Sequence, residues 1–313
     1  MKNPGKFLSA CPVCKTGKDF DFLMNASQRG KSFSLYLCKE CQVQFWHPMK
    51  NPGGVWYERN NPYKVRDIEG NKVYRGYHKK FLERSENLPK SFKILDLGCG
   101  AGEFIYELSK KGFDVFGIDF DGKAIEIAKE RFGLKNVSAD SFENFFKKSN
   151  SKKFDVITFF EVLEHLDNHR EFIENLKKVL KPGGRMALST PSRERVLANW
   201  NKWDFPPHHF TRWNKKSIEN IFSKNGFKLD FIDYVETFKI TMGAIDGKLR
   251  SGLVQKSLNN AKDEKGLLLP NVLYWLAKLK QWILAGIPGL FLWLFGKITK
   301  RNNGIMYIEM THE

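Results

Sequence analysis

The 313-residue sequence has few acidic residues, few cysteines and no hydrophobic run long enough to cross a membrane. Asp and Glu number 35 against 52 Lys and Arg, so the formal charge is +17 and points to an anionic partner: nucleic acid, an acidic membrane surface or a phosphorylated substrate. Five cysteines in a chain of this length exclude a small extracellular disulfide scaffold. Residues 1–10 contain no apolar core of the kind that a signal peptide needs, so we expect a cytoplasmic protein.

What the chain does contain is 42% hydrophobic residues, which is typical of a folded globular protein. Its composition changes along the sequence and predicts five parts. They are a zinc-ribbon-like module (1–50), a polar connector (51–92), a core (93–239), a basic and hydrophobic helical insertion (240–303) and a last core strand (304–313).

The core alternates short apolar runs with amphipathic stretches. Strands are expected at residues 93–97, 114–119, 137–140, 154–160 and 185–190. Near-continuous apolar strands separated by helices predict an α/β fold with a parallel sheet that is covered on both faces.

A glycine-rich turn follows the first of these strands. Gly98, Gly100 and Gly102 let the backbone approach a ligand closely at the start of a helix, on the carboxyl edge of the sheet. Asp119 ends the next strand, 21 residues after Gly98, where a carboxylate can accept hydrogen bonds from ribose hydroxyls. Asp119 could instead cap the following helix.

Two cofactor classes fit such a turn. Nicotinamide dinucleotide enzymes prefer Gly-x-Gly-x-x-Gly, but here the third glycine comes one residue early. Asp96 also stands two residues before the first glycine, where it would repel a pyrophosphate and suit a cationic sulfonium ligand.

The ordered motifs resemble those of class I S-adenosylmethionine (SAM)-dependent methyltransferases. They are ILDLGCGAGEF (94–104), GIDFD (117–121), Asp140, FDVITFFEVLEHL (154–166) and LKPGGRMALSTP (180–191). The resemblance implies a Rossmann-like, seven-stranded, mostly parallel sheet, with residues 228–235 and 305–310 as its sixth and seventh strands. It also implies a set of SAM-binding residues: Asp96, Gly98, Gly100, Gly102, Asp119, Phe120, Asp140, Ser141 and Glu161.

Two segments offer groups for catalysis beyond the fourth and fifth strands. Glu161, Glu164 and His165 would converge if a helix began there, and they resemble a segment of ubiquinone-pathway O-methyltransferases that is implicated in metal binding. The same residues also occur in relatives without a metal, and Glu161 could simply close the cofactor pocket.

The second segment is Pro206 to Trp213. His209 is our first candidate for a general base toward a hydroxyl acceptor, His165 the second, and His208 a further one. The alternative is that the prolines fix a loop and the histidines bond to its backbone.

The four N-terminal cysteines form two Cys-x-x-Cys pairs separated by 23 residues: Cys11, Cys14, Cys38 and Cys41. Two such knuckles can close a tetrahedral site, which predicts structural Zn²⁺ with no open coordination position for catalysis. Redox-active pairs are the alternative. A β-hairpin, with residues 33–37 as one strand, would fill the spacing.

The insertion combines positive charge with apolar residues. Residues 248–303 hold ten Lys or Arg and two acidic residues, a net charge of +8, and residues 282–296 are an apolar run of 15. Such a run is shorter than the roughly 20 residues of a membrane span. It favours peripheral contact with an anionic membrane, and a lid over the active site or a dimer contact are the alternatives.

The sequence therefore predicts an enzyme that transfers the methyl group of SAM to a small or lipid-linked, sugar-containing acceptor. A cysteine-rich ribbon, a Tyr-rich connector and such a core together resemble a bacterial family associated with sugar and surface-glycan methylation. One alternative is an RNA methyltransferase that uses the ribbon and the basic surface to hold RNA, although the sequence lacks the base-binding motifs expected of such an enzyme. The other is a non-catalytic scaffold recruited to membranes.

Overall fold

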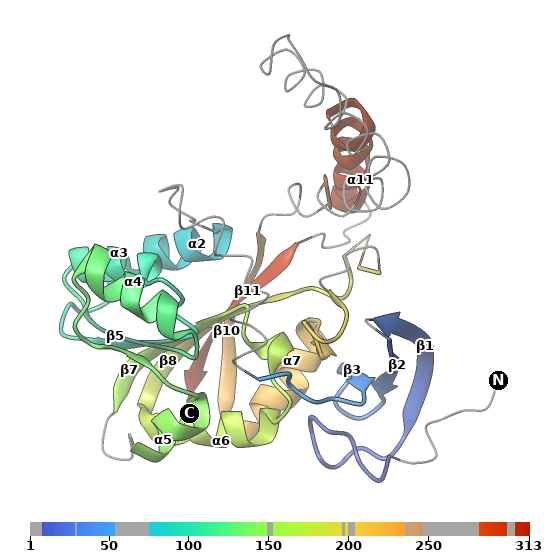
Figure 1. Ribbon diagram of the computed structural model, residues 1–313, viewed down its shortest axis with the longest axis horizontal. Helices are drawn as coiled ribbons and strands as arrows, with labels where there is room; N and C mark the ends of the chain where they lie inside the picture. Colours follow the sequence, from blue (N-terminus) through green and yellow to red (C-terminus); the bar gives the residue numbers. More distant parts are fainter. Residues whose placement is uncertain are drawn as a thin grey trace, which may run out of the picture.

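Figure 1 shows the computed structural model of the chain. The structure describes residues 8–28, 30–53, 75–148, 153–195, 198–199, 204–235, 238, 241–242, 245, 282–298 and 304–313. The predicted connector and insertion are therefore covered only in part, and residues 54–74 and 246–281 lie outside the described residues.

A seven-stranded sheet forms the centre of the molecule, in the order β10-β11-β8-β7-β4-β5-β6. Its strands are β4 (Lys93–Leu97), β5 (Asp114–Asp119), β6 (Val137–Ala139), β7 (Phe154–Phe160), β8 (Leu180–Pro191), β10 (Phe227–Val235) and β11 (Ile305–His312). The five strands from β8 to β6 are parallel, whereas β11 runs antiparallel to both β8 and β10. The predicted Rossmann-like, mostly parallel fold is confirmed.

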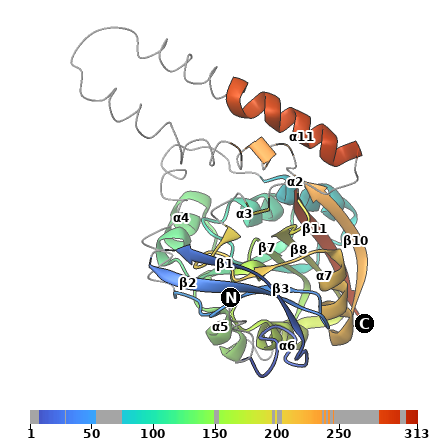
Figure 2. The ribbon, with the colours of Figure 1, turned by 90° about the vertical axis from the view of Figure 1, so that its right-hand side faces the viewer.

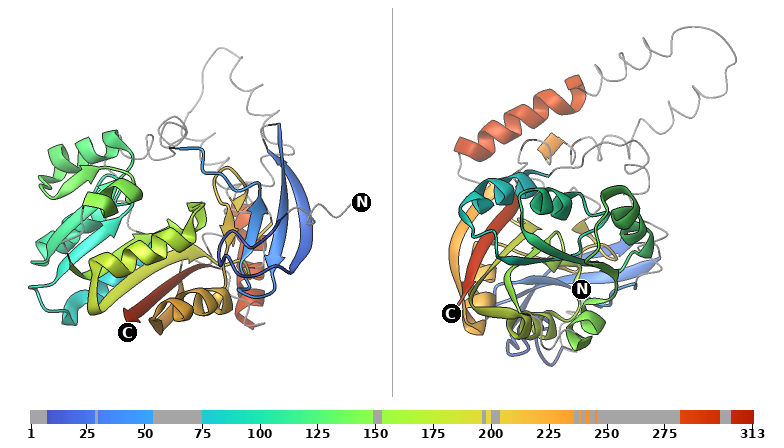
Figure 3. Two further views of the ribbon diagram at one scale, coloured as in Figure 1. Left: turned by 90° about the horizontal axis from the view of Figure 1, so that it is seen from below. Right: turned by 90° about the vertical axis from the view of Figure 1, so that its left-hand side faces the viewer.

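Helices cover both faces of this sheet (Figures 1 and 3). On one face lie α2 (Gly76–Arg84), α3 (Glu103–Lys110) and α4 (Gly122–Phe132); on the other lie α5 (Phe142–Lys148), α6 (His169–Val179) and α7 (Lys215–Phe222). In β4, Ile94 packs in the first layer and Leu95 in the second, because alternate side chains of a strand point to opposite faces. This double cover explains why the strands read as apolar runs.

The N-terminal module is a second, antiparallel sheet in the order β1-β2-β3-β9. β1 (Phe20–Gln28) and β2 (Lys31–Cys38) form the expected hairpin, and β3 (Gln44–His47) follows. The fourth strand, β9 (Thr211–Arg212), comes from the core, with Phe45 paired to Thr211. The module is therefore joined to the core by main-chain hydrogen bonds.

The insertion leaves and rejoins the large sheet at neighbouring points, since Val235 of β10 pairs with Ile305 of β11. Within it, the structure describes a π-helical turn, η8 (Trp282–Gly286), that continues into α11 (Ile287–Ile298). In Figure 2, α11 lies outside the layered domain, on the side of α2. Among the described residues, no helix has both the length and the apolar character needed to cross a bilayer.

Candidate functional site: a SAM crevice beside a histidine cluster

The glycine turn connects β4 to α3 at the carboxyl edge of the parallel strands. Gly98 and Gly102 have φ of +82° and +87°, a region that disfavours side chains. A Cβ on Gly98 would lie 2.8 Å from Val162 Cγ2, so this position has no room for one. Position 98 therefore requires glycine, and the turn packs directly against the segment that follows β7.

Asp119 is the last residue of β5, and its side chain stabilises the glycine turn by hydrogen bonding. Its carboxylate accepts hydrogen bonds from the backbone N–H groups of Gly100 and Asp121, both at 2.9 Å. Burial raises the pKa of Asp119 to about 6. The helix-capping role that was an alternative for Asp119 belongs to Asp121, which accepts from Lys123 and Ala124 at the start of α4. Phe120, the residue after Asp119, is 40% exposed.

Asp96, near the end of β4, is the second buried acid beside the glycine turn, and only 4% of it is exposed. We call the region formed by the glycine turn, Asp96 and Asp119 the crevice. It accepts a hydrogen bond of 2.6 Å from Thr158 Oγ1 on β7. Burial raises its pKa to about 7, and the negative charge of Asp119 adds to the shift. Two carboxyl groups with raised pKa values favour a positively charged ligand beside them.

Asp140 lies just beyond β6 and already has two partners. Its Oδ1 accepts from the Ser141 backbone N–H at 2.9 Å, and its Oδ2 lies 2.7 Å from Lys148 Nζ. Lys148 lowers the pKa of this carboxyl, so Asp140 is ionised at neutral pH. The roles of Asp140 and Ser141 in SAM binding remain predictions.

Glu161 follows β7 with φ of +56°, a strained conformation for a residue with a side chain. Its N–H donates to Ser189 of β8, and Ser189 Oγ donates to Glu161 Oε1 at 3.1 Å. Glu161 therefore joins the ends of two strands beside the glycine turn, where it was expected to close the cofactor pocket.

A histidine cluster lies next to this crevice. Glu164, His165 and His209 have ligand atoms within 4.8 Å of one another, whereas Glu161 is outside this group. The convergence of Glu161, Glu164 and His165 was conditional on a helix at this point, and only a short 3-10 turn, Leu163–His165, forms there. The ring of His208 is likewise outside the group, and its carbonyl oxygen bonds to His165 Nδ1 at 2.7 Å.

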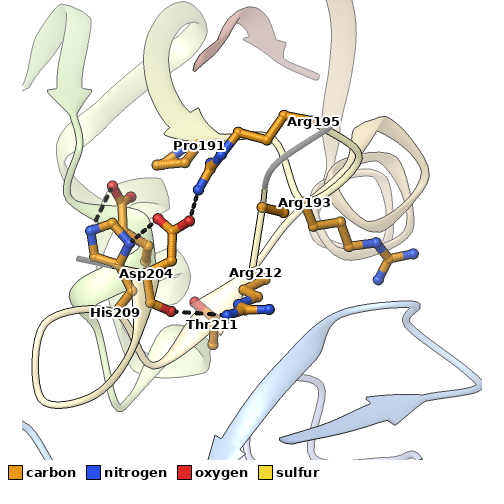
Figure 4. A pocket seen from close by; sticks show the side chains of 9 residues that line it. Pro191, Arg193, Arg195, Asp204, His209, Thr211 and Arg212 are labelled. Carbon is orange, nitrogen blue, oxygen red and sulfur yellow. Dashed lines mark hydrogen bonds and ion pairs between the residues drawn. The ribbon is translucent and has the colours of Figure 1, made fainter. Parts of the chain in front are cut away.

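Figure 4 shows the surroundings of His209. Its Nδ1 lies 3.2 Å from Asp204 Oδ1, and its Nε2 lies 3.9 Å from Glu164 Oε1. Asp204 also forms a buried ion pair with Arg195. Burial lowers the pKa of His209 well below its usual value, and the charge of Arg195 adds to this, so the imidazole is neutral at pH 7.

These groups line a small pocket that is partly open to solvent. Its wall includes Arg193, Arg195 and Arg212 beside His209 and Asp204. Sequence reasoning missed the three arginines and Asp204. The available signal was the acid at position 204, five residues before His209 in the same Pro-rich loop.

The four cysteines of the N-terminal module meet at one point. Cys11 Sγ lies 3.9 Å from Cys41 Sγ, and Cys14 Sγ lies 3.9 Å from Cys38 Sγ. A tetrahedron with metal–sulfur bonds of about 2.3 Å has sulfur–sulfur edges of about 3.8 Å. The cluster therefore fits a structural Zn²⁺ held by four thiolates.

Comparison with known proteins agrees with this geometry. Residues 69–230 match the methyltransferase domain family. The chain is 29% identical over 208 residues to the mitochondrial ubiquinone biosynthesis O-methyltransferase of Dictyostelium discoideum, covering 57% of this chain and 63% of that protein. It is 37% identical over 114 residues to the corresponding enzyme of Schizosaccharomyces pombe, covering 35% and 42%. The chain thus spans less than two thirds of either relative.

A solved structure shares the fold. One chain of the complex between the Haloferax volcanii Trm112 methyltransferase activator and the putative methyltransferase superimposes with a TM-score of 0.51 at 14% identity, covering 82% of this chain and 94% of that one. The sheet, the crevice and the family match define the class, and the chain belongs to the SAM-dependent methyltransferases.

Proposed function

We propose that the protein transfers the methyl group of SAM to a hydroxyl group of a small or lipid-linked, sugar-containing acceptor. The crevice of Gly98, Asp96 and Asp119 would hold the cofactor, which supplies a methyl group on a good leaving group. The remaining task of the protein is to align the acceptor and to remove the hydroxyl proton.

The observation that carries the proposal is the pairing of His209 with Asp204 at the carboxyl edge of the sheet. When Nδ1 carries the proton on the side of Asp204, the lone pair of Nε2 is available for a second proton. The lowered pKa of His209 keeps that lone pair free at neutral pH. Such a base is needed by an oxygen acceptor, and the two ubiquinone relatives are O-methyltransferases by name.

The lining of the pocket supports a polar acceptor. Arginine side chains and a carboxylate can bond to hydroxyl and anionic groups, as the sugar portion of a glycan or a phosphate linkage would require.

Incubation with methyl-labelled SAM and a cell extract, followed by separation of lipid, glycan and RNA, tests the proposal. Label is expected in the lipid or glycan fraction, as a methyl ether. His209→Gln is expected to lower the rate by about 10²–10⁴-fold and to leave SAM affinity within about twofold. His208→Gln is the matched control, because it keeps the backbone carbonyl that His165 contacts, and it should retain activity.

Label confined to RNA, or equal rates for the wild type and His209→Gln, would contradict the proposal. At saturating SAM, the wild-type rate is expected to stay level from about pH 8 down to about pH 6.5, since the pKa of His209 lies below the ordinary value of about 6.5.

A further inference from the structure

The helical segment Trp282–Ile298, comprising η8 and α11, exposes a large apolar surface. Its most exposed side chains are Ile298 at 81%, Phe291 at 70% and Ile287 at 53%. Ile283, Leu284, Leu290 and Leu294 are each more than 40% exposed. Apolar side chains gathered in this way on one helix are rare on the surface of a water-soluble domain.

The orientation of α11 is the reverse of that of a normal surface helix. Its buried positions include Gly289 and Gly296, and a Cβ on Gly289 would lie 3.4 Å from Met242 Cα. Trp293 contacts Phe238, with ring centroids 6.3 Å apart. An amphipathic helix normally turns its large apolar residues to the core and its polar ones to water. Here two glycines and Trp293 face the protein, and most of the Leu, Ile and Phe residues face outward.

The charge of the sequence around the helix identifies the occupant. Lys278 and Lys280 precede the segment, Lys300 and Arg301 follow it, and the stretch 248–303 carries a net charge of +8. A second copy of the chain would bring the same positive charge against this one. An anionic lipid surface matches both properties, because acyl chains accept the apolar side chains and headgroups attract the lysines.

The topology places this surface on the side of the molecule where the chemistry occurs. Val235 and Ile305 bracket the insertion, and Ile305 pairs with Pro191 at the end of β8. That end is the carboxyl edge, where the glycine turn lies and where Pro191 lines the His209 pocket. The insertion thus leaves the sheet at its functional edge, and α11 lies outside the domain on that side of the large sheet (Figure 2).

We propose that residues 282–298 form a docking surface for an anionic lipid membrane. The segment lies in the plane of the headgroups, since its 17 residues fall short of the roughly 20 needed to span the hydrocarbon core. Docking holds the carboxyl edge of the sheet close to acceptors that are carried in the bilayer.

Vesicle flotation with the full-length protein tests the proposal. The wild type is expected to float with phosphatidylglycerol-containing vesicles, and less with vesicles of phosphatidylcholine alone or at high salt. The double variant Phe291→Asp, Ile298→Asp is expected to lose about tenfold or more of its partition coefficient. Leu23→Asp is the matched control: Leu23 is 42% exposed on β1 and its replacement should leave flotation unchanged.

Failure of the wild type to float, or equal flotation of the double variant, would overturn docking. So would a wild-type dimer in sedimentation equilibrium that the double variant converts to a monomer, because the surface would then be covered by a second copy. Calorimetric SAM affinity of each variant is measured in parallel, so that a loss of docking is distinguished from a loss of the methyltransferase site.

Discussion

We expect two buried carboxyl groups, Asp96 and Asp119, to determine how SAM binding responds to pH. Their pKa values are raised to about 7 and about 6, so both carry protons for part of the time near neutral pH. A cation bound beside them favours the ionised form, and its binding must therefore release protons. Protonation of either group has to be reversed before the cation gains its full interaction energy.

We expect SAM affinity to rise with pH from about 5.5 to about 7, by up to about tenfold per pH unit for each carboxyl group below its pKa. Titration calorimetry in two buffers of different ionisation enthalpy would count the released protons. Asp96→Asn should reduce the pH dependence to the part that Asp119 contributes, whereas Asp140→Asn should leave it unchanged, because Lys148 keeps Asp140 ionised throughout. A wild-type affinity that is independent of pH would contradict this account.

At the residue scale, the sequence could predict the site residues that directly follow a strand. Gly98, Asp119 and Glu161 all follow apolar runs, and the carboxyl ends of parallel strands meet at one edge. Asp204 and Arg195 could not be found in this way. They come together because a loop after β8 folds back onto Glu164, and local periodicity carries no information about such a contact.

At the scale of elements, we expect the N-terminal sheet to depend on its four cysteines. Its hairpin ends at Cys38, and the other three cysteines lie in turns and loops outside the strands. Metal binding to such sites supplies folding free energy, about 10–16 kcal/mol in isolated zinc-finger peptides.

We expect one zinc ion per chain by atomic absorption, and its loss in Cys38→Ser together with a lower thermal midpoint. Cys99→Ser is the matched control, because Cys99 lies in the glycine turn and its loss should leave the zinc content unchanged. Methyl transfer should also fall in Cys38→Ser, since β3 pairs with β9 and Phe210 N–H donates to the Glu164 carbonyl. Full zinc content in Cys38→Ser would exclude a zinc site made of the four cysteines.

The large sheet could be predicted strand by strand because each strand is a separate apolar run between turn residues. β9 is only two residues long and has no such signal, so the pairing of the N-terminal module with the core could not be predicted. The strand β8 also begins earlier than expected, at Leu180 rather than at residue 185, because Leu180 already pairs with Phe154 of β7 before a register shift. Tertiary pairing determines both of these boundaries.

At the scale of the whole molecule, the two sheets share one hydrophobic core. Tyr36 and Phe45 of the N-terminal module belong to the same buried cluster as Leu95 and Trp213. Arg212 adds a link, with its guanidinium 5.2 Å from the ring centre of Trp46. Each large side chain buried in this way contributes about 1.5–3 kcal/mol, so separating the sheets would expose a costly surface.

We therefore expect a single cooperative thermal transition, in which far-UV circular dichroism and zinc release have the same midpoint. A chain that begins at residue 51 should be insoluble or lack a cooperative transition. It lacks the N-terminal side chains that pack in the cluster of Trp213 and the strand β3 that pairs with β9. Two separate transitions, with zinc released well before the core unfolds, would show that the module is an independent domain.

The pairing of Val235 with Ile305 has a consequence for how this protein could change over time. Residues 236–304 start and finish on adjacent strands, so their length hardly affects the entropy of closing the loop, which grows by only about 0.6 kcal/mol per doubling. This insertion can be replaced by a shorter or chemically different segment while the antiparallel pairing of β10 with β11 is kept. The same transferase scaffold could thereby be retargeted to a new cellular surface without rebuilding its crevice.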